Sequence, residues 1–197
     1  MTPKALRSIR LALGLSVPAR ANDEWRPINP ADLALKDNPA SPGSQAMILY
    51  REEYTDSMAS YVTEYYRIKI FTAAGKKYGD IEIPYDKSVA SVNDLKARTI
   101  LPNGTVVEFK GKPFEKVIAK SGGVKEYEAT FTFPDVQPGC IIEYKYRMQY
   151  NSDYYWNITW NIQENLFTRD ALFSIRPPRG ENAPVLYWRT FGFSQPM

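Results

Sequence analysis

Residues Leu95 to Phe109 read LKARTILPNGTVVEF, two runs of alternating residues around the turn sequence Pro102-Asn103-Gly104. Asn-Gly between such runs is a strong β-hairpin signal, because both residues accept the positive φ angles that a tight turn requires. The alternation sorts the two arms into an apolar face with Leu95, Ala97, Val107 and Phe109 and a polar face with Lys96, Arg98 and Glu108. The stretch therefore predicts a half-buried antiparallel sheet.

The same alternation recurs along most of the chain at hairpin spacing, without a convincing long helix. The further predicted strands are residues 45–50, 61–72, 81–83, 114–119, 127–133, 141–150, 156–163, 167–175 and 185–188. Residues 51–60 are expected to form a polar connection and residues 73–76 a turn. An aromatic content of 14% also favours sheet over helix. The sequence predicts an all-β domain, an antiparallel β-sandwich or open barrel of about ten strands.

The first 21 residues are typical of a secretory signal peptide. Three basic residues within the first ten precede a short apolar stretch, LALGLSV, and Ala19-Arg20-Ala21 offers a cleavage site before Asn22. The alternative is an amphipathic N-terminal helix. No later apolar run approaches the length of a membrane span. The sequence thus predicts an exported protein, periplasmic or secreted.

Removal of residues 1–21 would change the sign of the net charge. The whole chain carries 25 Lys and Arg against 22 Asp and Glu, a formal charge of +3. Four of the basic residues and none of the acidic ones lie in residues 1–21, which leaves 21 against 22, or −1. The basic pI of about 8.8 therefore belongs to the predicted signal peptide and does not indicate a nucleic-acid surface.

Residues 22–178 are expected to form one β-sandwich domain, because 197 residues allow one sizeable core and no linker interrupts the pattern. Its first part, residues 22–44, is rich in proline and small residues. We expect it to lie as an extended arm across the domain, anchored by Trp25, with one helical turn between Ala31 and Lys36. We expect residues 179–197 to form a C-terminal extension that begins a further region.

The chain contains no histidine and a single cysteine, Cys140. The absence of imidazole removes the usual general base, a common zinc ligand and the partner that activates a cysteine nucleophile. Cys140 follows a Pro-Gly pair at the start of a predicted strand, where a small residue packs under a turn. The sequence accordingly predicts no catalytic residues, no metal site and no cofactor.

The candidate binding residues are the aromatic side chains between residues 150 and 156, namely Tyr150, Tyr154, Tyr155 and Trp156. The adjacent rings of Tyr154 and Tyr155 cannot both point into one face of a sheet, so at least one should be partly exposed. Exposed rings at a loop tip can stack on a sugar or on a partner surface. The competing interpretation is that these rings cap the end of the sandwich core.

Two other patterns invite a functional interpretation. Glycoside hydrolysis needs two carboxylates at a defined separation, and four carboxylates lie close in sequence: Glu126, Glu128, Asp135 and Glu143. The three glutamates fall on the polar faces of their strands, so we expect them to be solvated. Asn103-Gly104-Thr105 and Asn157-Ile158-Thr159 match the glycosylation acceptor pattern, but a turn and a polar strand face explain them better.

A set of longer motifs runs through residues 22–178: WRPI (25–28), ALKD (34–37), EYYRIKIF (64–71), KART (96–99), PNGT (102–105), PDVQPG (134–139) and IIEY (141–144). In these motifs the chain resembles a bacterial domain of unknown function that lies between a signal peptide and a transglutaminase-like domain in exported multidomain proteins. The resemblance implies an all-β domain and a neighbour whose Cys-His-Asp triad would perform acyl transfer or peptide hydrolysis. Without histidine, this chain cannot carry that triad.

The leading hypothesis is a non-catalytic, exported β-domain that packs against, positions or gates a transglutaminase-like domain. That domain would be supplied by a continuation of the gene beyond Met197, whose full-length product would then be an enzyme, or by a separate protein. The alternative is a free-standing glycan- or peptide-binding module that uses the loop of residues 150–156. A third hypothesis is an enzyme built on carboxylates alone.

Overall fold

The computed structural model describes residues 8–12, 24–121, 124–151, 160–161 and 165–179. The strands are β1 (Ser8–Ala12), β2 (Ala46–Asp56), β3 (Tyr61–Ile70), β4 (Asp80–Asp86), β5 (Ala90–Ile100), β6 (Val106–Glu108), β7 (Phe114–Ser121), β8 (Val124–Thr132), β9 (Ile141–Tyr150) and β10 (Thr168–Arg176). The helices are α1 (Pro30–Ala34) and a short 3-10 helix, η1 (Ala73–Gly79).

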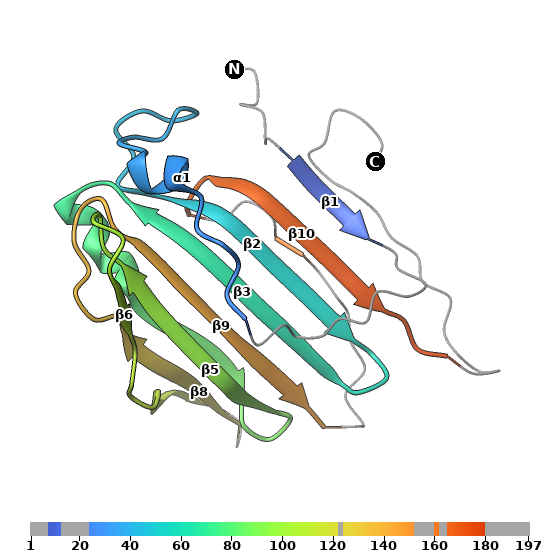
Figure 1. The fold of residues 1–197 in the computed structure, drawn as a ribbon. Helices are drawn as coiled ribbons and strands as arrows, with labels where there is room; N and C mark the ends of the chain where they lie inside the picture. Colours follow the sequence, from blue (N-terminus) through green and yellow to red (C-terminus); the bar gives the residue numbers. More distant parts are fainter. Residues whose placement is uncertain (1–7, 13–23, 122–123, 152–159, 162–164, 180–197) are drawn as a thin grey trace.

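The strands form two open sheets that lie against each other (Figure 1). The large sheet has seven strands in the order β1-β10-β2-β3-β9-β5-β6, and the small sheet has three in the order β4-β8-β7. Over the described residues neither sheet closes into a barrel. The all-β, sandwich-like fold predicted from the alternating pattern is therefore confirmed.

The hairpin of β5 and β6 turns at the Asn-Gly pair. The Gly104 N–H donates to the Leu101 carbonyl at 2.8 Å, and Gly104 has a φ of +86° that glycine adopts without strain. Arg98 lies opposite Glu108 in the ladder, and the Phe109 N–H donates to the Ala97 carbonyl. Ala97 is buried against the small sheet while Arg98 faces the other way. Turn and register are as predicted.

Strand β2 is longer than expected, so the predicted polar connection over residues 51–60 is wrong for its first half. The strand continues through Asp56, and the chain turns only at residues 57–60. Arg51, Glu53 and Thr55 are buried on the face that β2 turns toward the small-sheet side. Their polarity suggested a loop, but they form a buried charged cluster, described below.

Two smaller expectations also differ from the structure. Residues 73–79 form η1 instead of a simple turn. Strand β4 passes through Pro84, which was expected to end it. Because β4 is the edge strand of the small sheet, the missing N–H of Pro84 leaves no gap in a central ladder.

The strands at one edge of the large sheet run parallel. β10 pairs in parallel with β2, from Thr168 opposite Ile48 to Arg176 opposite Asp56. β1 pairs in parallel with β10, from Ser8 opposite Asp170. The other described pairs are antiparallel. The predicted strands at residues 156–163 and 185–188 lie outside the described residues except for Trp160 and Asn161, which belong to no strand.

The main core lies between the two sheets and is rich in aromatic rings. Tyr66 and Tyr144 stack at 4.9 Å, and Phe131 and Phe133 of the small-sheet side meet the Tyr144 ring edge-on. A second core lies on the opposite face of the large sheet, where Met47, Leu49, Ile100 and Ile141 pack against Leu33 and Leu35 of the arm. None of the described helices is long and apolar enough to cross a membrane.

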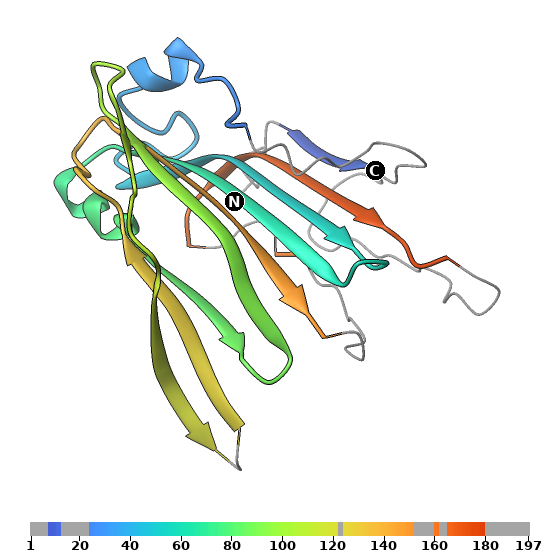
Figure 2. The same ribbon diagram turned by 60° about the horizontal axis from the view of Figure 1, so that its bottom comes forward.

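The N-terminal arm, residues 24–44, crosses this second face (Figures 1 and 2). Asn29 caps the N-terminus of helix α1, and its side-chain oxygen accepts the Ala31 N–H at 3.0 Å. Pro30 occupies the first position of the helix. The large sheet is therefore covered on one face by the small sheet and on the other by the arm.

Candidate functional site

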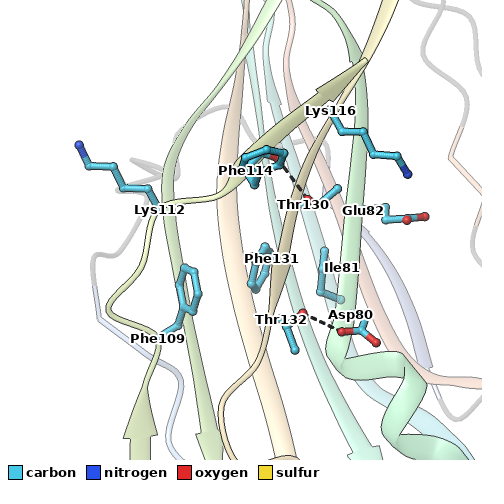
Figure 3. A pocket seen from close by; sticks show the side chains of 10 residues that line it. All are labelled: Asp80, Ile81, Glu82, Phe109, Lys112, Phe114, Lys116, Thr130, Phe131 and Thr132. Carbon is cyan, nitrogen blue, oxygen red and sulfur yellow. Dashed lines mark hydrogen bonds between the residues drawn. The ribbon is translucent and has the colours of Figure 1, made fainter. Parts of the chain in front are cut away.

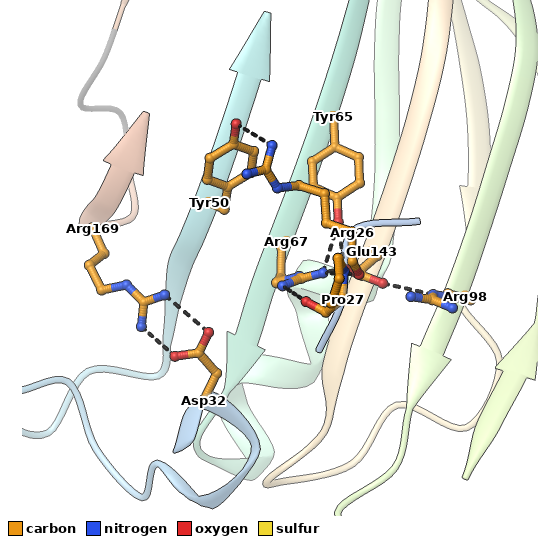
Figure 4. Close-up of polar contacts among 9 residues, drawn as sticks. All are labelled: Arg26, Pro27, Asp32, Tyr50, Tyr65, Arg67, Arg98, Glu143 and Arg169. Carbon is orange, nitrogen blue, oxygen red and sulfur yellow. Dashed lines mark hydrogen bonds and ion pairs between the residues drawn. The ribbon is translucent and has the colours of Figure 1, made fainter. Parts of the chain in front are cut away.

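One cluster of charged residues lies beneath the arm (Figure 4). Its centre is the fully buried Glu143 of β9. One carboxylate oxygen accepts from Arg67 Nε and from the Tyr65 hydroxyl, the latter at 2.5 Å, and the other accepts from Arg98 Nε at 2.7 Å. Arg67 and Arg98 are the ladder neighbours of Glu143 on β3 and β5, so strand pairing alone brings the three together. We call Tyr65, Arg67, Arg98 and Glu143 the arm cluster.

The arm cluster binds the arm through backbone carbonyls. The Arg67 guanidinium donates to the carbonyl oxygens of Arg26 and Pro27 at 2.7 and 3.0 Å. Trp25 lies beneath two cations, with Arg98 4.6 Å and Lys145 4.8 Å from its ring centre. Burial and the neighbouring Glu143 raise the pKa of the Tyr65 hydroxyl, which keeps it a hydrogen-bond donor. These contacts attach the arm to the centre of the large sheet.

Helix α1 is attached by two further contacts. Asp32 accepts a bidentate pair from Arg169 of β10, at 2.5 and 3.1 Å, and this hydrogen bonding raises the pKa of Arg169 (Figure 4). Lys69 Nζ donates to the carbonyl oxygens of Leu33 and Gly139 at 2.7 and 2.6 Å, while burial lowers its pKa. The charged groups on this face are therefore engaged in holding the arm.

The prediction that Glu143 is solvated is wrong, because the arm covers the sheet face that the alternation identified as polar. Glu126 is exposed on the small sheet, Glu128 lies 3.7 Å from Lys116, and Asp135 occupies a positive-φ position in a turn. Glu143 belongs to the other sheet and to the face away from the small sheet. The structure thus does not bring these carboxylates together as an acid–base pair.

A second charged cluster lies on the opposite face of the large sheet. Glu53 and Glu64 are ladder neighbours on β2 and β3. Arg51 Nη2 lies 3.7 Å from a Glu53 oxygen and 3.6 Å from a Glu64 oxygen. Trp160 Nε1 donates to Glu53 at 2.5 Å, and Arg51 Nη1 donates to the Asn161 carbonyl at 2.6 Å. We call Arg51, Glu53, Glu64 and Trp160 the inner cluster.

Glu64 of the inner cluster is the strongest candidate for a group that keeps its proton at neutral pH. Its side chain is 13% exposed. Burial, followed by the nearby Glu53 carboxylate, raises the pKa of Glu64 to about 8, and Arg51 only partly offsets these effects. Perturbed carboxyls cluster at functional sites. Glu64 can hold a proton, and it does not line the groove described next.

A groove of about 550 Å³ opens on the small sheet (Figure 3). Its lining residues come from β4, β7, β8 and the segment after β6: Asp80, Ile81, Glu82, Phe109, Lys112, Phe114, Lys116, Thr130, Phe131 and Thr132. Phe109 and Phe131 pack at 5.2 Å, and Phe114 is 73% exposed. We call this feature the edge groove. Sequence alternation placed Phe131 in the core but gave no signal for an opening beside it.

The aromatic residues predicted to bind a ligand are only partly described. Tyr150 is half-buried, packs against the main core and donates its N–H to the Ser60 carbonyl at 2.8 Å. Tyr154, Tyr155 and Trp156 lie outside the described residues. The exposed ring that the structure does place, Phe114, belongs to the edge groove on the other sheet.

Nucleophilic and metal chemistry find little support in the described part of the chain. Cys140 is fully buried, and burial raises the pKa of its thiol, which disfavours the reactive thiolate. Within the described residues, no group of three or more Cys, Asp or Glu is arranged to hold a metal ion. Among the described residues, the edge groove is therefore a candidate for binding, and the two charged clusters contribute ion pairs and hydrogen bonds within the fold.

Among solved structures, the chain is similar to a protein from Parabacteroides distasonis ATCC 8503 described as a "putative protease", with 16% identity and a TM-score of 0.58. The match covers 66% of this chain and 29% of that protein, so it shows a shared fold within a longer chain. Two structures of a family 3a carbohydrate-binding module from the Clostridium thermocellum scaffoldin cipA also match. They have 14% and 15% identity, cover 58% and 56% of this chain and 64% and 71% of theirs, and have TM-scores of only 0.26 and 0.25.

No curated protein matches the sequence. A family profile does match, over residues 56–193, which is more than half of the chain. Its description is a domain of unknown function with solved structure, DUF3857. The matched region begins at Asp56, the last residue of β2, and includes strands β3 to β10. The chain belongs to the DUF3857 family.

Proposed function

We propose that this chain is a non-catalytic, exported β-domain that packs against, positions or gates a transglutaminase-like domain. The observation that carries the proposal is the match to the Parabacteroides distasonis protein, in which a similar fold accounts for only 29% of a chain described as a "putative protease". A domain of this kind therefore occurs beside other parts of a larger protein. By analogy, catalysis belongs to the neighbouring domain.

The chemistry of this chain is consistent with catalysis by a neighbouring domain. The sequence has no histidine, so it cannot supply the imidazole of a Cys-His-Asp triad. The buried Arg67, Arg98 and Glu143 are engaged in holding the arm. Acyl transfer or peptide hydrolysis would thus require residues of the partner, and this domain would contribute a surface.

Export would also provide an edge for docking. Cleavage after Ala21 would remove β1, which pairs with β10 in the full chain. An unpaired strand edge is a template for another chain, so we expect the partner to dock along β10. Mass spectrometry of the exported protein should give Asn22 as the first residue, and a mature chain that retains Met1 would contradict export by this route.

The direct test uses residues 22–197 and the transglutaminase-like domain encoded in the same reading frame or in a neighbouring gene. Isothermal titration calorimetry should show a 1:1 complex, and addition of the β-domain should change kcat or KM of the partner on a peptide amide. The proposal fails if no such domain is encoded nearby, or if the two neither bind nor affect activity.

The second candidate is a free-standing peptide- or glycan-binding module that uses Tyr150, Tyr154, Tyr155 and Trp156. It is favoured by the concentration of aromatic rings in that stretch. Replacement of Tyr154 and Tyr155 by Ala should abolish binding without loss of stability. Lowered stability with unchanged binding would instead indicate that the rings cap the core.

A further inference from the structure

The edge groove lies where one strand ladder of the small sheet stops short. β8 pairs with β4 as far as Thr132, which faces Asp80. On its other side, β8 pairs with β7 only from Thr130, which faces Phe114, because Pro113 precedes β7 and the chain leaves the sheet there. The last residues of β8 therefore have a strand on one side and the edge groove on the other.

The backbone of Thr132 is directed toward this opening. The N–H of Phe133 donates to the Gly79 carbonyl on the β4 side at 2.8 Å. Backbone groups of consecutive residues in an extended strand point to opposite edges, so the N–H and C=O of Thr132 point into the edge groove. In the described part of the chain, no backbone hydrogen bond joins Thr132 to the segment between β6 and β7. One donor and one acceptor are thus available for an added strand.

The side chains around the opening differ between its two faces. Toward the main core, Phe109 and Phe131 present apolar ring surface (Figure 3). On the outer face, the carboxylate of Asp80 accepts the Thr132 hydroxyl at 2.7 Å, and Glu82 is exposed beside it. Of the two lysines that line the groove, Lys112 directs its ammonium group outward (Figure 3), and the ammonium group of Lys116 lies 3.7 Å from a Glu128 oxygen. An extended segment lying here would meet apolar surface inward and negative charge outward.

We propose that the edge groove binds an extended peptide as an added β-strand next to Thr132. The peptide residue opposite Thr132 shares its outward face and is basic, because a long side chain there can reach over Thr132 to the Asp80 carboxylate on β4. The residues on either side of that basic residue point inward and are apolar, to pack on Phe109 and Phe131. Phe114, the ladder partner of Thr130, lies on the outer face, where its exposed ring can pack on the side chain of the bound basic residue. Main-chain hydrogen bonds supply affinity and the alternating pockets supply specificity.

The open backbone distinguishes a peptide from a sugar as the occupant. A sugar can stack on Phe114, but it cannot continue a ladder of alternating donors and acceptors. The outward carboxylates also favour a cationic ligand over a neutral one. This peptide site is distinct from the aromatic loop of residues 150–156 and does not require a transglutaminase-like partner.

The probe is the peptide Ac-Ser-Phe-Lys-Val-Ser-NH2, titrated into ¹⁵N-labelled full chain and followed by NMR. We expect the Thr132 and Thr130 amide signals to shift, with a dissociation constant of about 0.1–1 mM, as suits a single short strand. Methylation of the lysine backbone nitrogen should abolish binding, because it removes the donor to Thr132. Replacement of the peptide lysine by glutamate should weaken binding about tenfold.

Two protein variants test separately the contacts of Phe114 and of Asp80 with the bound peptide. Phe114→Ala should weaken binding about fivefold without unfolding the domain, because this ring is largely exposed. Asp80→Asn should remove the preference for lysine over glutamate. Met58→Ala is the matched control, since Met58 is an exposed apolar residue in the turn between β2 and β3, and it should change nothing.

Three results would overturn the proposal. The first is no shift at Thr132 with several millimolar peptide. The second is equal binding of the N-methylated peptide, which would mean contact through side chains only. The third is a shift of the same amides by maltohexaose without any response to the peptide, which would make the edge groove a sugar site.

Discussion

The arm cluster and the inner cluster lie on opposite faces of one sheet. The arm cluster has more basic than acidic groups, and the inner cluster has more acidic than basic groups. The arm cluster has two guanidinium groups, Arg67 and Arg98, around the single carboxylate of Glu143, and carbonyl oxygens of the arm accept from the terminal nitrogens of Arg67. The inner cluster has two carboxyl groups beside the single guanidinium of Arg51. Excess positive charge is thus satisfied by backbone, and excess negative charge by a proton on Glu64.

The difference teaches what each cluster depends on. The arm cluster requires residues 24–37 to be in place, because Arg26 and Pro27 supply its acceptors. The inner cluster requires a protonated Glu64, and hence a pH below its raised pKa of about 8. The stability of the arm cluster therefore depends on the position of the arm, and the stability of the inner cluster depends on pH.

The largest effect should come from the centre of the arm cluster. Glu143→Ala leaves two buried guanidinium groups without their carboxylate and should lower the free energy of unfolding by about 3–5 kcal/mol. Urea denaturation measures it. Glu115→Ala is the control, because it removes an exposed pair with Lys87 and one hydrogen bond from Tyr85 and should cost about 1 kcal/mol. Similar losses in both variants would contradict the claim that burial distinguishes Glu143.

The attachment of α1 should come next. Arg169→Ala removes the bidentate partner of the buried Asp32 and should cost about 2 kcal/mol. Hydrogen exchange should accelerate at Ala31 and Leu33 while amides at the centre of β3 and β9 change less. Arg169→Lys keeps the charge but not the fork and should recover only part of the loss. Uniform acceleration over the whole domain would mean that the arm does not open separately.

The inner cluster predicts a pH dependence of definite sign. Glu64 binds its proton more tightly in the folded chain, where its pKa is raised to about 8, than in the unfolded chain. Its stabilising contribution is complete below the unfolded pKa of about 4.3 and is lost as pH rises through 8. Wild type should therefore lose stability relative to Glu64→Gln between pH 5 and 9, by about 4 kcal/mol.

The control for this titration is Glu82→Gln, which neutralises an exposed carboxylate of β4 and should follow wild type throughout. Comparison of wild type with Glu64→Gln cancels the titration of the groups that do not contact Glu64. Parallel stability curves for the two proteins would show that Glu64 is ionised in the folded chain, and the contrast between the clusters would fail.

The smallest effect concerns the contact of Trp160 with the inner cluster. Trp160→Phe keeps a ring against Phe173 but removes the N–H that donates to Glu53. We expect a loss of about 1 kcal/mol in urea denaturation. The loss should grow above pH 8, because ionised Glu64 repels the Glu53 carboxylate and the Trp160 N–H then stabilises Glu53 more strongly. A loss that is the same at pH 6 and pH 9 would indicate that the protonation of Glu64 does not affect the hydrogen bond between Trp160 and Glu53.

Local sequence signals predicted much of the fold but not the depth of burial. The β5–β6 hairpin followed from Asn103 and Gly104, since turn chemistry and alternation act over a few residues. The alternation also sorted Arg67, Lys69 and Glu143 correctly onto one face of their strands. It could not show that this face is covered, because the covering arm lies 30 or more residues away and contacts it through backbone carbonyls.

The inner cluster and the edge groove were missed for different reasons. Arg51 and Glu53 have the composition of a loop, and only the continued ladder of β2 with β3 shows them to be a strand. The edge groove arises because the β7–β8 ladder ends before the β4–β8 ladder does, which is a property of register between strands. Lys112-Pro113 before Phe114 was the one available signal, since proline cannot continue a ladder.

The most direct test of the proposed role is the activity of the transglutaminase-like domain with and without this β-domain, both as separate purified proteins. The account predicts that residues 22–197 alone release no product from a peptide amide, and that their addition changes the kcat or KM of the catalytic domain by a saturable, 1:1 interaction. Activity of the β-domain alone, or identical kinetics of the catalytic domain at saturating β-domain, would contradict it.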